Sequence, residues 1–277
     1  MLAARICDLL HIVGTVSPLD RRALLCGAAL GAAGTVLSAC ANGTDARPSP
    51  TGSRASTAPG ASGAPATHAA TASQALADLP FEIQSGPTTT DRVALTFHGQ
   101  GDPAIARSVL AEAERAHARI TVMAVGSWLD AYPEMAKRIL DGGHELGNHT
   151  QNHLAISSLS PDQAYAEIDR CAQRLRQLTG SIGTWFRPSQ AQDCTASVSA
   201  QARRVGYTHC LSYEVDSLDW QDPGAAAVTR TVLEKTRAGS VVSMHFGHTG
   251  TVAALPAILA GLHQRGLSAV TTSELLS

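Results

Sequence analysis

The segment VALTFHGQGDP, residues 93–103, carries two ionisable side chains just beyond an apolar run of strand type. His98 and Asp102 follow that run and lie in a turn that contains Gly99 and Gly101. In α/β folds, reactive groups collect at the carboxyl ends of parallel strands. An imidazole is suited to act as a general base near neutral pH or as a metal ligand, and a carboxylate can bind a metal or cap a helix. The turn is therefore a candidate site.

Other ionisable or aromatic side chains stand where later apolar runs of strand type end. They are His149, His153, Arg187, Asp216, Asp219, Trp220 and His245. Because parallel strands end at one edge of a sheet or barrel, we expect these side chains to gather in one place. Two imidazoles four residues apart can reach one metal ion from a single turn, and His149 and His153 have this spacing.

Extended segments and helical spacings alternate from residue 92 onward. Extended segments are predicted at 92–97, 119–126, 144–150, 183–188, 207–215, 240–246 and 267–276, with helices at 103–116, 132–143, 160–180, 196–206, 223–239 and 252–266. This alternation predicts an α/β fold, a small, distorted or incomplete (β/α) barrel of about seven strands. A doubly wound open sheet is the alternative, but no GxGxxG follows the first strand.

Composition limits the classes of function. The chain has 277 residues and a formal net charge of −2, which fits one sizeable domain and argues against nucleic-acid binding. Three cysteines fall in the predicted domain, enough for one disulfide and one free thiol. We predict the pair Cys194–Cys210 and a free Cys171, although a protein folded before export could have no disulfide.

The first 80 residues have the composition of an export signal and a tether. Arg21 and Arg22 precede a short apolar run, and LSAC (residues 37–40) ends it. The arginine pair resembles a twin-arginine signal and LSAC a lipobox, whose cysteine, Cys40, is lipidated; an ordinary signal peptide is the alternative. Residues 41–80 are mostly Ala, Gly, Ser, Thr and Pro, which predicts a disordered tether before a domain at 85–277. The expected location is the outer face of the cell membrane, as a lipoprotein.

From Arg92 to Ser277 the sequence resembles the polysaccharide deacetylases of carbohydrate esterase family 4, which share the NodB homology domain. GHELGNHTQNH (residues 143–153) matches the family's second motif, whose core is H-S/T-x-x-H. FRPS (186–189), DSLDW (216–220) and VVSMH (241–245) match the third, fourth and fifth motifs in order and spacing. The resemblance implies a metal-dependent hydrolase that removes acetyl groups from N-acetylated sugars.

The resemblance also implies roles for individual residues. His149 and His153 would bind one divalent ion, most simply zinc, and His245 would protonate the leaving amine with Asp219 orienting it. Arg187 would hold the catalytic base, the backbone N–H of Gln190 would contribute to the oxyanion site, and Trp220 would wall the acetyl pocket. The implied partners are a glycan substrate and, through Cys40, the membrane; neither nucleic acid nor a protein partner is implied.

Structural alternatives remain open for these residues. Arg187 could form a structural salt bridge, His245 could be a core histidine, and Asp219 could cap a helix beside a core Trp220. The remaining histidines of the domain are interpreted as structural or surface residues: His117, His144, His248 and His263.

The first motif departs from the family. Where the family has T-F-D-D-G, with a base and a metal ligand as the two aspartates, this chain has Thr96, Phe97, His98, Gly99 and Gln100. We predict that His98 is the base and Asp102 the third metal ligand, since the glycines allow an unusual path of the turn. Alternatively His98 completes a three-histidine metal site and Asp102 caps a helix. A non-catalytic glycan-binding lipoprotein is the competing function.

Replacement of Cys40 tests the predicted anchor. If the mature protein begins at a lipidated Cys40, Cys40→Ala should release it from membranes or stop its processing, as measured by fractionation. Unchanged membrane association of this variant would rule out lipid anchoring at this position.

Overall fold

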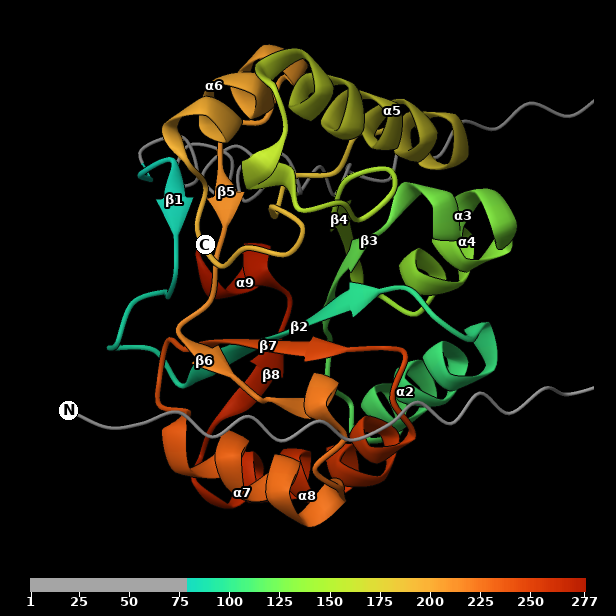
Figure 1. Ribbon diagram of the computed structural model, residues 1–277. Helices are drawn as coiled ribbons and strands as arrows, with labels where there is room; N and C mark the ends of the chain where they lie inside the picture. The colour runs from blue at the N-terminus through green and yellow to red at the C-terminus, as the bar shows by residue number, and fades with distance from the viewer. Residues whose placement is uncertain (1–78) are drawn as a thin grey trace, which may run out of the picture. The chain divides into compact units, whose positions relative to one another are not determined.

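The longest strand, β2 (Arg92–Gly99), lies in the middle of the sheet in the computed structural model, which describes residues 79–277. It pairs in parallel with β3 (Thr121–Ala124) on one side and β7 (Val241–His245) on the other. β4 (Glu145–Asn148) continues the sheet beyond β3, and β6 (Val215–Asp216) continues it beyond β7. Figure 1 shows β2 and β7 side by side at the centre of the domain.

The sheet curves toward an incomplete barrel. β8 (Ser268–Val270) pairs with the beginning of β2, and β1 (Glu82–Ile83) pairs with β5 (Cys210–Leu211), all in parallel. Phe186 forms isolated parallel bridges to both Asn148 and Cys210, so it links β4 to β5. The predicted α/β fold with a parallel sheet is confirmed.

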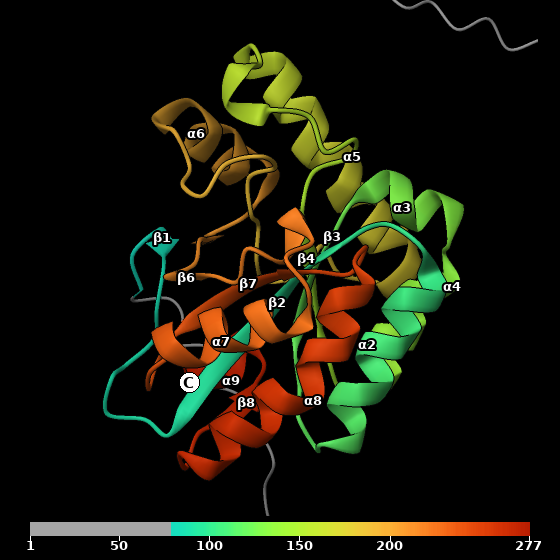
Figure 2. The ribbon, with the colours of Figure 1, turned by 60° about the horizontal axis from the view of Figure 1, so that its bottom comes forward.

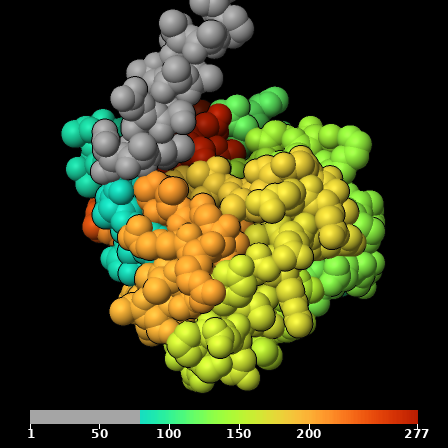
Figure 3. All heavy atoms as spheres, turned by 90° about the horizontal axis from the view of Figure 1, so that it is seen from above, coloured from blue at the N-terminus to red at the C-terminus, as the bar shows by residue number. Residues whose placement is uncertain are grey.

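Helices pack outside the strands. They are α2 (Pro103–Arg115), α3 (Gly126–Ala131), α4 (Glu134–Asp141), α5 (Pro161–Thr179), α6 (Ala196–Val205), α7 (Ala225–Lys235), α8 (Thr249–Gln264) and α9 (Thr272–Leu275). Figure 2 shows α2 beside α8, and these two contact each other, as do α7 and α8. Figure 3 views the domain from the side of α5 and α6. Residues from the middle of the chain, coloured yellow and orange, form the surface there, and teal residues from the beginning of the domain lie beside them.

The boundaries of α5 follow from its sequence. Ser160 accepts from the backbone N–H of Gln163, and the Gln163 side chain accepts from the backbone N–H of Ser160, a reciprocal capping box. Pro161 begins the helix, and Gly180 ends it with a φ of 82°, which a residue with a side chain adopts only under strain. The predicted helix at 160–180 is confirmed.

Three predicted strands are wrong in detail. The segment 267–276 contains β8 and then the helix α9. The segment 207–215 contains β5 and only the first residue of β6, and 183–188 contributes only the bridge at Phe186. The Arg187 side chain donates to the carbonyls of Leu211 and Ser212. The hydroxyl of Ser189 donates to the Leu154 carbonyl, and that of Ser212 donates to the Asp193 carboxylate. Polar groups of the site therefore interrupt these last two segments, which hydropathy alone does not show.

The predicted export signal and most of the predicted tether, including Arg21, Arg22 and Cys40, lie outside the described residues. Among the helices between residues 79 and 277, none has the length and apolar character needed to cross a membrane.

A half-buried carboxylate lies at the end of the barrel opposite His98. Glu145, at the start of β4, accepts from Trp185 Nε1 at 2.9 Å, from Thr121 Oγ1 at 3.1 Å, and from the backbone N–H and hydroxyl of Ser273 at the start of α9. Burial raises the pKa of Glu145, and the four donors oppose that effect. The carboxylate thereby fastens the C-terminal helix to β3 and β4.

Removal of this carboxylate should destabilise the domain. Glu145→Ala should lower the free energy of unfolding by about 2–4 kcal/mol, because several buried donors would lose their acceptor. Urea denaturation measures the change. Glu134→Ala is the control, since the exposed pair of Glu134 with Arg107 contributes little. Equal stability of the two variants would mean that the cluster around Glu145 is not a structural fastening.

Candidate metal centre and active site

Three imidazoles meet at the carboxyl ends of β2 and β4. His98 is the penultimate residue of β2 and His149 follows β4 directly. Each of His98, His149 and His153 offers one nitrogen, and these three nitrogens lie within 4.8 Å of one another. The register of the sheet brings these histidines together. His98 lies opposite Met123 of β3, and the next residue of β3, Ala124, lies opposite Asn148 of β4, which directly precedes His149.

His149 has one nitrogen engaged and one free. Its Nδ1 lies 3.0 Å from the carbonyl oxygen of Arg187, an acceptor that selects the tautomer with a proton on Nδ1. Its Nε2 is buried and has no hydrogen-bond partner among the residues that the structure describes. Burial, followed by the neighbouring His153, lowers the pKa of His149 well below its usual value. The Nε2 lone pair is therefore available to a metal ion.

His149 and His153 lie in the loop that follows β4, and this loop brings both imidazoles close enough to share one metal ion. Thr150 and His153 have positive φ values of 66° and 54°, which cost free energy in residues with side chains. α3, which the sequence did not predict, holds the loop: the N–H of Gly126 donates to Thr150 O at 2.9 Å, and that of Ser127 donates to Gln151 O at 2.8 Å.

A second clamp on this loop comes from α5. The buried carboxylate of Glu167 accepts from the backbone N–H of Asn152 at 2.7 Å and from its side-chain amide at 2.6 Å. Thr150 Oγ1 donates to Ser189 Oγ at 3.0 Å, which joins the loop to the segment that carries Arg187. These contacts stabilise the strained backbone that aims His153 at the other imidazoles.

His98 is buried between His149 and His245. Its ring centroid lies 4.3 Å from that of His149 and 4.3 Å from that of His245, and its Nε2 lies 3.4 Å from Ser243 Oγ. Burial, then the neighbouring His149 and His245, lowers the pKa of His98 well below its usual value. His98 is therefore held as a neutral imidazole that offers a lone pair.

Gly99 has no room for a side chain in this conformation. A Cβ atom there would meet Val122 Cγ1 at 2.8 Å and the Ala124 backbone at 3.1 Å. A carboxylate at position 99 would thus require β3 to shift. From the end of β2 to Asp102, His98 is the residue whose side chain joins the cluster among those that the structure describes.

Asp102 does not reach the histidines. Its carboxylate accepts from the backbone N–H of Ala104 at 2.8 Å, its backbone is extended, and it is the N-cap of α2 with Pro103 in the first turn. The exposed position satisfies one of the free N–H groups of the helix. This placement departs from our expectation of a third metal ligand and matches the alternative in which Asp102 is a helix cap.

His245 is oriented by a buried carboxylate. Asp219 accepts from His245 Nδ1 at 2.7 Å, from the backbone N–H of His245 at 2.8 Å and from Thr251 Oγ1 at 2.7 Å. Burial opposes ionisation of Asp219, but the hydrogen bonds outweigh it and hold the pKa of the carboxyl below its usual range. The His245 ring therefore presents Nε2 toward the cluster side, as the proton donor of a hydrolase would.

Arg187 forms no ion pair within residues 79–277, so the structural salt bridge is not its role there. Its side chain is fully buried, and Nε and Nη2 donate to the carbonyls of Leu211 at 2.7 Å and Ser212 at 3.0 Å. The guanidinium also lies 5.3 Å from the ring of Tyr213. Burial lowers the pKa of Arg187 to about 9.

Gln190 and Trp220 lie at the rim. Gln190 has a φ of 54°, and its side-chain amide donates to the His153 carbonyl at 2.8 Å. Trp220 is 51% exposed, which excludes the alternative of a core aromatic, and its Nε1 lies 3.4 Å from Asp216 Oδ2. Their assignments to the oxyanion site and to the acetyl pocket stay predictions.

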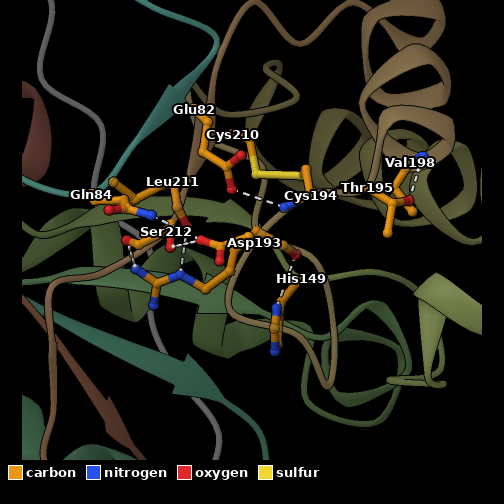
Figure 4. The surroundings of a disulfide bond; sticks show 11 residues. Glu82, Gln84, His149, Asp193, Cys194, Thr195, Val198, Cys210, Leu211 and Ser212 are labelled. Carbon is orange, nitrogen blue, oxygen red and sulfur yellow. Dashed lines mark hydrogen bonds between the residues drawn. A yellow bond between two sulfur atoms is a disulfide. The ribbon is translucent and has the colours of Figure 1, made fainter.

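A disulfide fastens the segment that carries Arg187 and Gln190. Cys194 and Cys210 are bonded, as predicted, and Cys171 is buried with a free thiol. Figure 4 shows Glu82 beside the disulfide, where its carboxylate accepts from the backbone N–H of Cys194 at 2.8 Å. The cross-link joins the end of this segment to β5, next to the carbonyl groups that hold Arg187.

Sequence reasoning missed three supporting residues: Ser243, Thr251 and Glu167. Ser243 lies two residues before His245 in β7, so the alternation of side chains along a strand points it to the same face. Thr251 and Glu167 carry no such signal, since each reaches its partner across the fold from a helix.

These residues fit a metal ion. The buried, unpartnered Nε2 of His149 is an unusual feature for a structural histidine, and two further imidazoles offer nitrogens beside it. Neutral imidazoles suit zinc, and three of them leave one coordination position open.

Similarity to known proteins agrees with this geometry. Residues 85–210 match the family model described as polysaccharide deacetylase. A peptidoglycan-N-acetylglucosamine deacetylase from Bacillus cereus is 31% identical over 194 residues, which cover 69% of this chain and 90% of that protein. The chain belongs to the polysaccharide deacetylase family.

Solved structures of the family have the same fold. A peptidoglycan N-acetylglucosamine deacetylase in complex with an N-oxidanyl-benzamide matches with a TM-score of 0.66 at 26% identity, covering 70% of this chain and 92% of the other. A mutant of a family pseudoenzyme from Bacillus anthracis, described as having restored enzymatic activity, matches with a TM-score of 0.68 at 25% identity, covering 73% and 74%. Family membership therefore includes both active and inactive proteins.

Two substitutions separate the roles of His98 and Asp102. His98→Ala should reduce bound zinc, because one of three clustered imidazoles is removed. Asp102→Ala should keep the metal content and cost about 1 kcal/mol of unfolding free energy, the usual effect of losing an N-cap. Elemental analysis after dialysis and urea denaturation measure the two quantities. Loss of zinc in Asp102→Ala but not in His98→Ala would restore our original assignment.

Proposed function

We propose that this domain is a metal-dependent hydrolase that removes acetyl groups from N-acetylated sugars of a cell-wall polysaccharide. The observation that supports this proposal most directly is the cluster of His98, His149 and His153 beside the Asp219–His245 pair. The relatives named as peptidoglycan-N-acetylglucosamine deacetylases support the choice of substrate class. The predicted lipid anchor at Cys40 would place the domain near such a polymer.

The three histidines would hold the ion through neutral nitrogens. His149 would bind through Nε2, since its Nδ1 faces the Arg187 carbonyl. His98 would take the place that a carboxylate has elsewhere in the family, because position 99 leaves no space for a side chain. A bound divalent ion would polarise the amide carbonyl and favour ionisation of a water molecule.

His245 would supply the acid–base chemistry. With Nδ1 held by Asp219, its Nε2 can accept the proton that the attacking water loses and then donate it to the leaving amine nitrogen. Asp219 would stabilise the imidazolium that exists between these two transfers. This assignment replaces our expectation that His98 is the base, because a nitrogen committed to the metal cannot accept a proton.

A non-catalytic glycan-binding role is the second candidate. It is favoured by one observation: no carboxylate hydrogen-bonds to His98, His149 or His153 in the described part of the chain, so the cluster lacks an acidic base. The family resemblance to a pseudoenzyme is consistent with this candidate. This candidate does not explain why Asp219 accepts two hydrogen bonds from His245 and is itself held in place by Thr251.

Replacement of His245 tests the proposed function. His245→Ala should reduce acetate release from an N-acetylglucosamine oligomer by about 10²–10⁴-fold, the usual effect of removing a positioned acid or base. Zinc content and oligomer binding should change little, because proton transfer acts on the transition state. His263→Ala, at an exposed position on α8, is the control and should keep full turnover. Absence of acetate release from the zinc-loaded parent protein would favour the glycan-binding role.

A further inference from the structure

Arg187 is a buried cation for which residues 79–277 provide no counter-charge. Two of its nitrogens bind neutral carbonyl groups, those of Leu211 and Ser212, and Nη1 is buried without a partner. No Asp or Glu forms an ion pair with it among residues 79–277. Burial of an unpaired guanidinium is costly, so a structure that keeps one usually offers it an anion.

The guanidinium belongs to the same site as the histidines. The backbone N–H of Arg187 donates to Asn148 O at 2.9 Å, and its carbonyl accepts from His149 Nδ1 at 3.0 Å. Figure 4 shows His149 in the same view as Leu211 and Ser212, whose carbonyls hold the guanidinium.

The partners available to Nη1 limit the kind of anion. Within the described part of the chain, Nη1 is the nitrogen of the guanidinium that is free, and His149 Nε2 is another buried polar atom of the site without a partner. A single planar negative group can accept from one nitrogen, whereas a phosphate dianion would need several donors to balance its charge. A carboxylate fits this requirement.

We propose that Arg187 Nη1 binds a carboxylate from a ligand, which supplies the negative charge that the side chains of this site lack. The carboxylate can belong to a free small acid or to an acidic sugar, and both share the group that Nη1 recognises. This inference does not require hydrolysis, so it applies equally to a catalytic and to a glycan-binding domain.

The binding test uses the full-length protein with and without bound zinc. Sodium acetate and sodium glucuronate serve as probes of a free acid and of an acidic sugar, with sodium chloride at equal ionic strength and glucose as controls. We expect a saturable rise in melting temperature with at least one carboxylate, because a ligand of the folded state stabilises it. Calorimetric titration should give one site per chain, and the tighter of the two probes identifies the source.

His98→Asp tests the location. The family resemblance places a carboxylate at position 98 within reach of Arg187, so this variant should provide its own anion and weaken binding of the probe by about tenfold or more. His98→Asn is the matched control, because it has nearly the same size as the aspartate and no charge, and it should still bind the probe. Both variants avoid replacing Arg187, whose loss could unfold the domain.

Three results would overturn the proposal. The first is a response to both carboxylates no larger than the response to chloride. The second is equal affinity of His98→Asp and His98→Asn for the probe. The third is binding that disappears when zinc is removed by a chelator, since the carboxylate would then be a metal ligand and not a partner of Arg187.

Discussion

The parallel register of β2 against its two neighbours is the constraint on which the site depends. It sets His98 opposite His245 on β7 and opposite Met123 on β3, while β3 in turn sets Ala124 opposite Asn148. A slip of one residue would turn His98 away from the cluster, because successive side chains in a strand point to opposite faces. Val93, Leu95 and Phe97 pack in the main hydrophobic cluster, whereas Ala94 packs in a second one, so a slip would take all three out of the cluster that they fill.

Electrostatics distinguishes this site from a simple acid–base pair. Buried imidazoles and a buried guanidinium share one small volume, and Asp219 is committed to His245 by three hydrogen bonds. Such a volume disfavours protonated histidines and favours anions, which is the opposite of a site built around two aspartates. The chain thus combines the framework of a deacetylase family with a different charge balance, and the balance decides which ligands it accepts.

The sequence predicted the sheet, the main helices and the histidines of the cluster, because hydrophobic period and motif spacing are local signals. It did not predict α3, the two short strands β5 and β6, or the loop conformation of His149 and His153, since these follow from contacts such as Glu167 with Asn152. The role of Asp102 was open because an Asp before a proline is equally a cap and a candidate ligand. Only the path of the turn distinguishes the two.

The position of β2 in the middle of the sheet also dictates when the site can form. β2 pairs with β7 and β8, which come about 150 residues or more later in the chain. During synthesis, His98, His149 and His153 leave the ribosome long before His245 and before α9, whose Ser273 fastens Glu145. The nascent chain therefore carries three exposed imidazoles without the scaffold that shields them, and closure of the sheet by its last strands completes both the fold and the selectivity of the site.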